Sequence, residues 1–128
     1  MPLNDAIDIL RKSKIIKRIV SSNFDGLSDS HVFKVRAELL NGWLLDYWEH
    51  KTPKIRRYSF HVFKNSQMIV RWDNTPHYPK LEGFPHHKHE GKTVVSSDVM
   101  TITEVLKQLE QLSLLPQLEK LSNIDSFT

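Results

Sequence analysis

Four of the chain's seven histidines lie within thirteen residues of one another, in a segment that also contains a lysine. They are His77, His86, His87 and His89, and Lys88 stands between the last two. The segment 75–92 has three prolines, two glycines and no hydrophobic period, which predicts a long loop. Loops longer than about a dozen residues inside a compact domain are usually functional or disordered. The cluster is therefore a candidate site.

Three roles are open to these histidines. Histidine titrates near neutral pH, so two of them could divide the base and acid roles at a phosphodiester. Neutral imidazoles also bind metals, but this spacing lacks the helical or paired-cysteine pattern that identifies zinc sites. The third role is structural, without chemistry. Four histidines beside Lys88 favour a site, and we expect it to work without a metal or another cofactor.

The segment Arg71–Trp72–Asp73–Asn74 leads directly into the histidine cluster. Because side chains alternate along a strand, Arg71 and Asp73 should share one face, and Trp72 and Asn74 the other. Arg71 could bind a phosphate while Asp73 orients a histidine. The alternatives are a surface ion pair for Arg71 and Asp73, and a turn before Pro76 shaped by Asp73 and Asn74.

The rest of the chain predicts helices at both ends and antiparallel strands between them. Residues 4–13 suit a helix capped by Asn4, and a stripe of apolar residues from Thr101 suits a second helix with Thr101 and Glu104 as a capping box. Residues 31–39 alternate in polarity, and Asn41–Gly42 predicts a type I′ hairpin turn before the strand that carries Glu49. A second hairpin across residues 64–67 and a short strand at 93–97 complete about five strands. The fold class is α+β.

Composition and charge limit the class of protein. At 128 residues the chain is long enough for one domain, and the absence of cysteine excludes disulfides and thiolate metal sites. Without an apolar leader or span we expect a cytoplasmic protein and no membrane contact. Residues 1–92 carry 16 Lys/Arg against 10 Asp/Glu, whereas residues 93–128 carry 2 against 5. The first balance of +6 favours a polyanionic partner.

Several of these motifs together resemble the TumE family of toxins from bacterial and archaeal toxin–antitoxin operons. They are a Tyr-Ser-aromatic strand (Tyr58–Ser59–Phe60), the segment from Arg71 through Asp73–Asn74 to Pro76–His77, and the run from Phe84 to His89. The resemblance covers about residues 15 to 100, and Tyr78 stands where the family often has another histidine. It implies a separately encoded antitoxin and a RelE/barnase-like fold. We expect a single toxin-like domain, 1–128, whose helical extension over about 101–128 lies outside the resemblance.

The resemblance implies the toxin of a type II toxin–antitoxin module, and from the residues themselves we expect that toxin to be a metal-independent endoribonuclease. In this hypothesis His77 or Glu49 is the base, His86 or His87 the acid, and Arg71 with Lys88 binds the charged phosphorane. Asp73 completes the catalytic set, and His89 and Asn74 contact the substrate. The expected partners are a cognate antitoxin, RNA and, in a homodimer, a second copy of the chain. Two alternatives remain: a non-catalytic nucleic-acid or protein-binding module, and a metal-dependent hydrolase with histidine ligands.

Overall fold

Seven strands and two helices form the part of the chain that the computed structural model describes, residues 2–27 and 29–112. The elements in order are α1 (Leu3–Lys12), β1 (Ile16–Leu27), β2 (Ser30–Leu39), β3 (Leu44–Lys51), β4 (Arg56–Lys64), β5 (Gln67–Asp73), β6 (His87–Glu90) and β7 (Thr93–Ser96). A second helix occupies residues 102–112, and the rest of the expected helical extension lies outside the described residues.

All seven strands belong to one sheet in which each strand pairs with its sequence neighbours, antiparallel throughout. The expected count of about five strands is therefore wrong, because β1 and β6 were not predicted. β1 is an edge strand whose residues are mostly exposed, so it shows no alternation of polarity. β6 is only four residues long and lies inside the segment expected to be a loop. The α+β class is confirmed.

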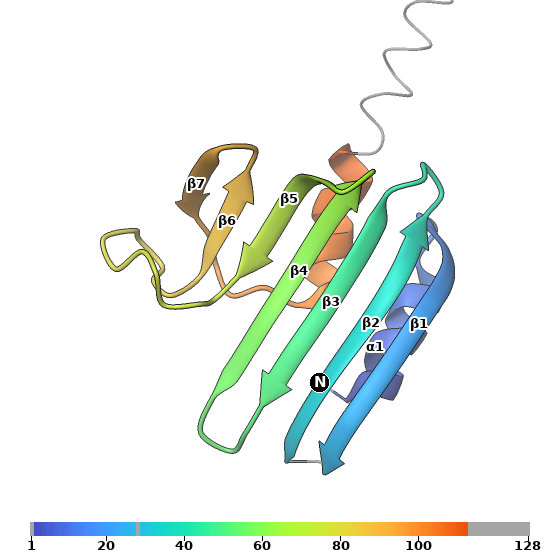
Figure 1. Ribbon diagram of the computed structural model, residues 1–128, viewed down its shortest axis with the longest axis horizontal. Coiled ribbons are helices and arrows are strands. Elements are labelled where there is room, and N and C mark those ends of the chain that lie inside the picture. The colour runs from blue at the N-terminus through green and yellow to red at the C-terminus, as the bar shows by residue number, and fades with distance from the viewer. Residues whose placement is uncertain (1, 28, 113–128) are drawn as a thin grey trace, which may run out of the picture.

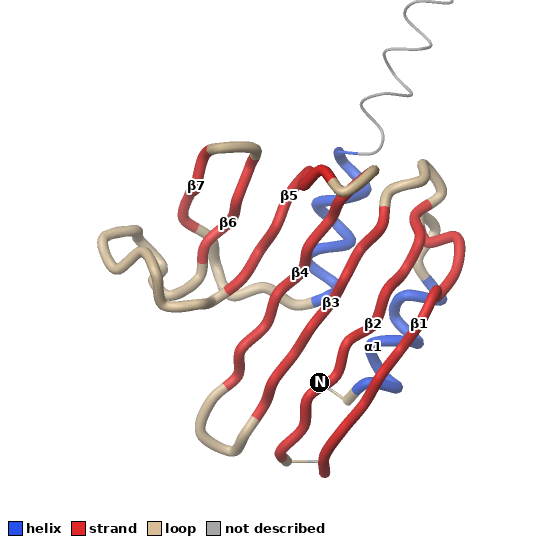
Figure 2. The backbone as a smooth tube through the Cα atoms, in the orientation of Figure 1, coloured by secondary structure: helices blue, strands red, loops and turns tan. Residues whose placement is uncertain are grey.

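Both helices cover the same face of the sheet and leave the other face open (Figures 1 and 2). α1 lies behind β1 and β2, and the helix at 102–112 lies behind β3 and β4. Alternate residues of β2, β3 and β4 are buried, as their polarity pattern predicts. We call the two sides of the sheet the helix face and the open face. The core on the helix face contains Phe33, Tyr47, Phe60, Trp72, Leu10, Val105 and Leu109, among others.

The turns and caps differ from expectation in two places. Gly42 has a φ of 91° but Asn41 does not have a positive φ, so the β2–β3 hairpin is confirmed but its type I′ turn is wrong. The two consecutive positive-φ residues that a type I′ turn needs are Asn65 and Ser66, between β4 and β5. α1 begins after Pro2 without a side-chain cap, so Asn4 does not cap it.

The second helix starts as predicted. The backbone N–H of Glu104 donates to Thr101 Oγ1 over 3.3 Å, which is one half of the expected capping box. No helix in the described part of the chain is long and apolar enough to cross a membrane.

Candidate functional site

The pairing of β5 with β6 decides which of the expected site residues meet. Arg71 lies opposite His89, and Asp73 lies opposite His87. Residues directly opposite in neighbouring antiparallel strands share a face, so these four side chains lie on the open face. We call Arg71, Asp73, His87 and His89 the Asp73 cluster. The expectation that Arg71 and Asp73 share a face and meet a loop histidine agrees with this geometry, although His87 and His89 lie on a strand.

Asp73 is the centre of the cluster and is almost completely buried, with 1% of its surface exposed. Its Oδ1 lies 2.9 Å from His87 Nε2, and its Oδ2 accepts a 2.9 Å hydrogen bond from Arg71 Nε. Oδ2 also lies 3.6 Å from His89 Nε2. The backbone N–H of Thr75 donates to Oδ1 over 3.0 Å, so Asp73 also shapes the turn that follows β5. The Asp73 carboxylate thus contacts three basic side chains. It also fixes the turn in which the chain leaves β5.

Both ring nitrogens of His87 face oxygen atoms. Nδ1 lies 3.0 Å from the carbonyl oxygen of Pro85, which can only accept, so Nδ1 carries a hydrogen and donates it. Nε2 lies 2.9 Å from Asp73 Oδ1 on the other side of the ring. His87 is 2% exposed. It is therefore a buried residue that holds Asp73 in place.

His89 and Arg71 are the members of the cluster that solvent reaches, with side chains 21% and 42% exposed. Burial lowers the pKa of His89, the Asp73 carboxylate opposes that shift, and electrostatic interactions with His87 and Arg71 add to it. His89 is therefore neutral at neutral pH and can accept a proton. Arg71 uses Nε to contact Asp73, and its exposed guanidinium can meet an anion.

The loop that leads to β6 packs its aromatic ring on the cluster. The Tyr78 ring stands edge-on to His87, with ring centres 4.9 Å apart, and to His89, 6.1 Å apart. His77 is exposed, and its ring centre lies 6.4 Å from that of Tyr78. Its charge also contributes to the lowered pKa of His89. His77 therefore lies beside the accessible part of the Asp73 cluster.

The same cluster contains a set of atoms that could hold a metal ion. One ligand atom from each of Asp73, His87 and His89 lies within 4.8 Å of the other two. The contact from His87 Nδ1 to the Pro85 carbonyl directs Nε2 toward Asp73, as backbone carbonyls do for metal-bound histidines. Against a cation, the positive charge of Arg71 already neutralises Asp73. The donor set fits an ion of the Zn²⁺ class, whose ligands are imidazole and carboxylate.

Beside the cluster, the open face carries a shallow hollow of about 320 Å³. Its lining residues come from β2, β3, β4 and β5, and we call it the open-face hollow: Lys34, Asp46, Trp48, Ser59, His61 and Arg71. Sequence reasoning did not select Lys34, Ser59 or His61. The alternation along β4, which places Ser59 and His61 opposite the core residues Tyr58 and Phe60, was the signal that could have found two of them.

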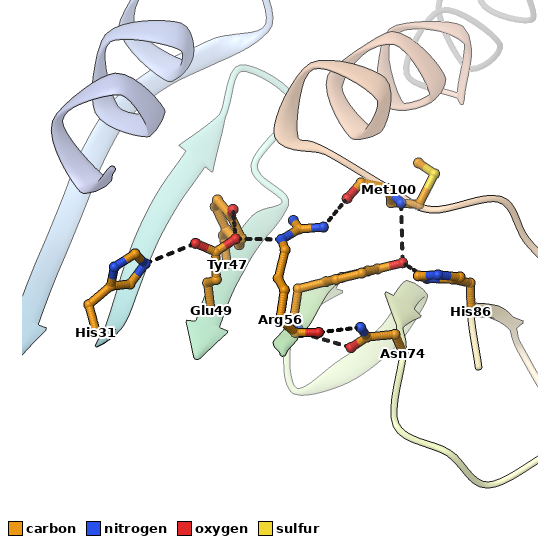
Figure 3. A network of polar contacts seen from close by, with 8 residues as sticks. His31, Tyr47, Glu49, Arg56, Asn74, His86 and Met100 are labelled. Carbon is orange, nitrogen blue, oxygen red and sulfur yellow. Dashed lines mark hydrogen bonds and ion pairs between the residues drawn. The ribbon is translucent and has the colours of Figure 1, made fainter. Parts of the chain in front are cut away.

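The helix face carries a different polar network, centred on Glu49 (Figure 3). Glu49 is fully buried and accepts hydrogen bonds from Arg56 Nε at 2.7 Å and from Tyr47 Oη at 3.0 Å, with His31 Nε2 at 3.1 Å. Burial opposes ionisation, but the contacts from Arg56 and His31 outweigh it and lower the pKa of Glu49. Arg56 also donates to the Met100 carbonyl over 3.0 Å, which ties the sheet to the segment before the second helix.

His86 belongs to this second network and not to the Asp73 cluster. Its Nδ1 lies 2.7 Å from Tyr58 Oη, which also accepts a hydrogen bond from the Met100 backbone N–H over 3.1 Å. Its ring stacks on that of Tyr58. Burial and the charge of Arg56 lower the pKa of His86. The sheet thus separates His86 from His87, the two residues expected to share the acid role.

Two further expected substrate contacts also lie away from the cluster. The Asn74 side chain accepts from the Tyr58 backbone N–H over 2.9 Å and donates to the Arg56 carbonyl over 2.7 Å, which joins the end of β5 to β4. Lys88 lies opposite Trp72 on the helix face, where its Nζ contacts Gln108 and Glu90. The structure does not bring Glu49, Asn74, His86 or Lys88 together with Arg71.

The chain was compared with families of known proteins, with curated proteins and with solved structures. A family model described as Toxin TumE matches residues 6–113. The match spans every strand of the sheet, the Asp73 cluster and nearly all of the two described helices. No curated protein and no solved structure matches the chain. The expected RelE/barnase-like fold therefore stays a prediction, and the sheet has more strands than we expected for it.

Proposed function

We propose, from the premise that this chain belongs to the TumE family of toxins, that the toxin is an endoribonuclease acting at the Asp73 cluster. The observation that carries the proposal is that two members of the cluster are buried and two are accessible to solvent. A buried pair, Asp73 and His87, holds two accessible groups, Arg71 and His89, on the open face of the sheet. A fixed cation beside a neutral imidazole is what cleavage of a phosphodiester needs.

The reaction uses the 2′-hydroxyl of RNA as the nucleophile. His89 accepts the proton of the 2′-hydroxyl, whose oxygen then attacks the adjacent phosphorus. The bond from phosphorus to the 5′-oxygen breaks, and His77 donates a proton to that leaving oxygen. The products are a 2′,3′-cyclic phosphate and a 5′-hydroxyl. No metal takes part in this sequence.

Arg71 stabilises the negative charge that develops on the phosphorane. Its Nε is held by Asp73 Oδ2, so the guanidinium keeps one orientation during the reaction. Asp73 and His87 are positioning residues in this proposal, because neither is exposed enough to touch RNA. The other expected site residues make structural contacts on and around the helix face, and we no longer assign them to the substrate or the reaction: Glu49, Asn74, His86 and Lys88.

The assignment to a toxin family implies an antitoxin that keeps the toxin silent. The basic, uncovered side of the sheet is the surface that an antitoxin must block if RNA is cleaved there. We propose that an acidic segment of the antitoxin covers Arg71 and Lys34, because opposite charges speed association and fix its orientation. The RNA substrate would place this activity in the cytoplasm.

A second candidate function is a metal-dependent hydrolase, and the observation that favours it is the set of ligand atoms on Asp73, His87 and His89. These residues would hold the ion, which would supply a Lewis acid and an activated water. This chain's own contribution would then be Arg71, which binds the phosphate next to that site.

Cleavage of RNA in the presence of a chelator separates the two candidates. Purified toxin in excess EDTA should cleave single-stranded RNA and leave 2′,3′-cyclic phosphate ends, detectable by their resistance to direct ligation and phosphatase. A toxin with Arg71→Ala should lose most of this activity and serves as the control against contaminating ribonucleases. Activity that disappears in EDTA and returns with one divalent ion, giving other ends, overturns the metal-independent mechanism in favour of the second candidate.

A further inference from the structure

The open-face hollow lies next to the Asp73 cluster, and apart from Arg71 its lining residues take no part in the proposed cleavage. Four strands contribute to it, and no helix of the described chain covers this side of the sheet (Figure 1). Its volume of about 320 Å³ is at the lower end of the range of roughly 300–1,000 Å³ for small-molecule sites. We infer that this hollow binds a nucleobase of single-stranded RNA, with Trp48 as the stacking surface; the inference rests on the proposed ribonuclease function.

Strand register places Trp48 at a suitable distance from the proposed scissile phosphate. Trp48 lies opposite Ser59, and Ser59 lies opposite Asp73, so Trp48 and Asp73 share one row across the open face. Neighbouring strands are about 4.8 Å apart, so two steps span roughly 10 Å. Arg71 lies one row away and lines both the hollow and the cluster. A base on Trp48 would therefore belong to a nucleotide next to the phosphate at Arg71.

The chemistry of the lining suits a base better than a purely ionic ligand. Trp48 offers an aromatic plane, and stacking on such planes is the usual way in which proteins hold unpaired bases. Ser59 and His61 offer hydrogen-bonding groups beside it. Burial and the charge of Arg71 lower the pKa of His61, so its imidazole is neutral and has one donor and one acceptor for a base edge.

The charges around the hollow complement the backbone of RNA. Lys34 is 51% exposed at one end and Arg71 is 42% exposed at the other. Asp46, the acidic residue of the lining, is neutralised by two hydrogen bonds from Arg36, at 2.7 and 2.9 Å. Although burial opposes ionisation of Asp46, the contacts with Arg36 lower its pKa. Asp46 Oδ2 also lies 3.7 Å from Lys34 Nζ, so one carboxylate faces two cations, and these three side chains together keep a net positive charge.

The test compares two oligonucleotides of the same charge. One is a short 2′-deoxy oligonucleotide, which lacks the nucleophile and cannot be cleaved by the proposed reaction. The other has the same backbone with abasic sites. The proteins are the complete chain and its Trp48→Ala, Trp48→Phe and Phe84→Ala variants. Phe84 is an exposed aromatic residue outside the hollow, so it controls for the loss of a surface ring.

We expect the unaltered toxin to bind the intact oligonucleotide roughly tenfold more tightly than the abasic one in isothermal titration calorimetry. The Trp48→Ala variant should lose this preference, Trp48→Phe should keep part of it, and Phe84→Ala should keep all of it. Equal binding of both oligonucleotides by the unaltered toxin, or an undiminished preference in Trp48→Ala, overturns the inference. So does a toxin that binds neither oligonucleotide at low salt but does bind an acidic peptide through Trp48.

These binding results are independent of cleavage. A toxin that prefers intact bases through Trp48 but does not cut RNA would refute the proposed function and leave the base-binding site standing. A toxin that cuts RNA but shows no preference for bases would refute the base-binding site and support the proposed function.

Discussion

His87 Nε2 lies 2.9 Å from Asp73 Oδ1, and both side chains are almost completely buried at the junction of β5 and β6. Removing Asp73 would leave the buried Nε2 of His87 without its partner, and unpaired buried polar groups are costly. The contact therefore has consequences for stability that are separate from any role in catalysis.

Replacement of Asp73 should destabilise the fold strongly. Asp73→Ala leaves His87 and Arg71 without their carboxylate, and we expect a loss of about 1–3 kcal/mol in the free energy of unfolding because a buried polar group loses its partner. Urea denaturation followed by circular dichroism measures the change. Glu90→Ala is the control, because the Glu90 side chain is 51% exposed and its contact with Lys88 should contribute less than about 1 kcal/mol. Equal stability losses in the two variants would show that Asp73 is not the anchor of β6.

Glu49 should prove structural and not catalytic. Glu49→Gln keeps the shape of the side chain but removes the charge that faces Arg56 and His31. We expect a loss of about 1.5–3 kcal/mol in the free energy of unfolding, because hydrogen bonds to a charged group are lost. Cleavage of RNA per folded molecule should stay within about threefold, because sites without shared partners act independently. A folded Glu49→Gln toxin with no activity would restore Glu49 as a candidate base.

Mild acid should destabilise the toxin through histidines on both faces. The pKa values of His61 and His86 are lowered, with burial as the first cause of each shift. Between their folded pKa values and the ordinary value near 6.5, the unfolded chain binds more protons than the folded one. The free energy of unfolding should therefore fall as pH decreases from 7.5 to 5.5. A double variant, His61→Asn with His86→Asn, should show a shallower decrease in urea unfolding, and an unchanged slope would contradict this.

Sequence periodicity predicted the central strands because one side of each is buried. Phe33, Val35 and Ala37 alternate with charged residues, and the same logic identified the strands around Tyr47 and Phe60. Periodicity failed for β1, because an exposed edge strand has no apolar side. It also failed for β6, where histidine, lysine and glutamate carry no hydrophobic signal and the strand forms by pairing with β5.

The sequence predicted which segment contains the candidate site, but not which of its side chains lie together. The spacing of the histidines identified the segment, and the alternation in β5 correctly grouped Arg71 with Asp73. Adjacent residues point to opposite faces only if the segment is a strand, so an expected loop gave no reason to separate His86 from His87. The contact of Glu49 with His31 and Arg56 depends on the register of three strands, which no local pattern reveals.

The most direct measurement of the central claim compares two histidines that lie three positions apart on opposite faces of the sheet, His86 and His89. Cleavage of RNA by purified His89→Ala toxin in EDTA should fall by about 10²–10⁴-fold, because the proposed proton acceptor is lost. His86→Ala, which removes the contact with Tyr58, should retain its rate per folded molecule. An inactive His86→Ala beside an active His89→Ala, with both proteins folded by circular dichroism, would place the chemistry on the helix face and contradict the account.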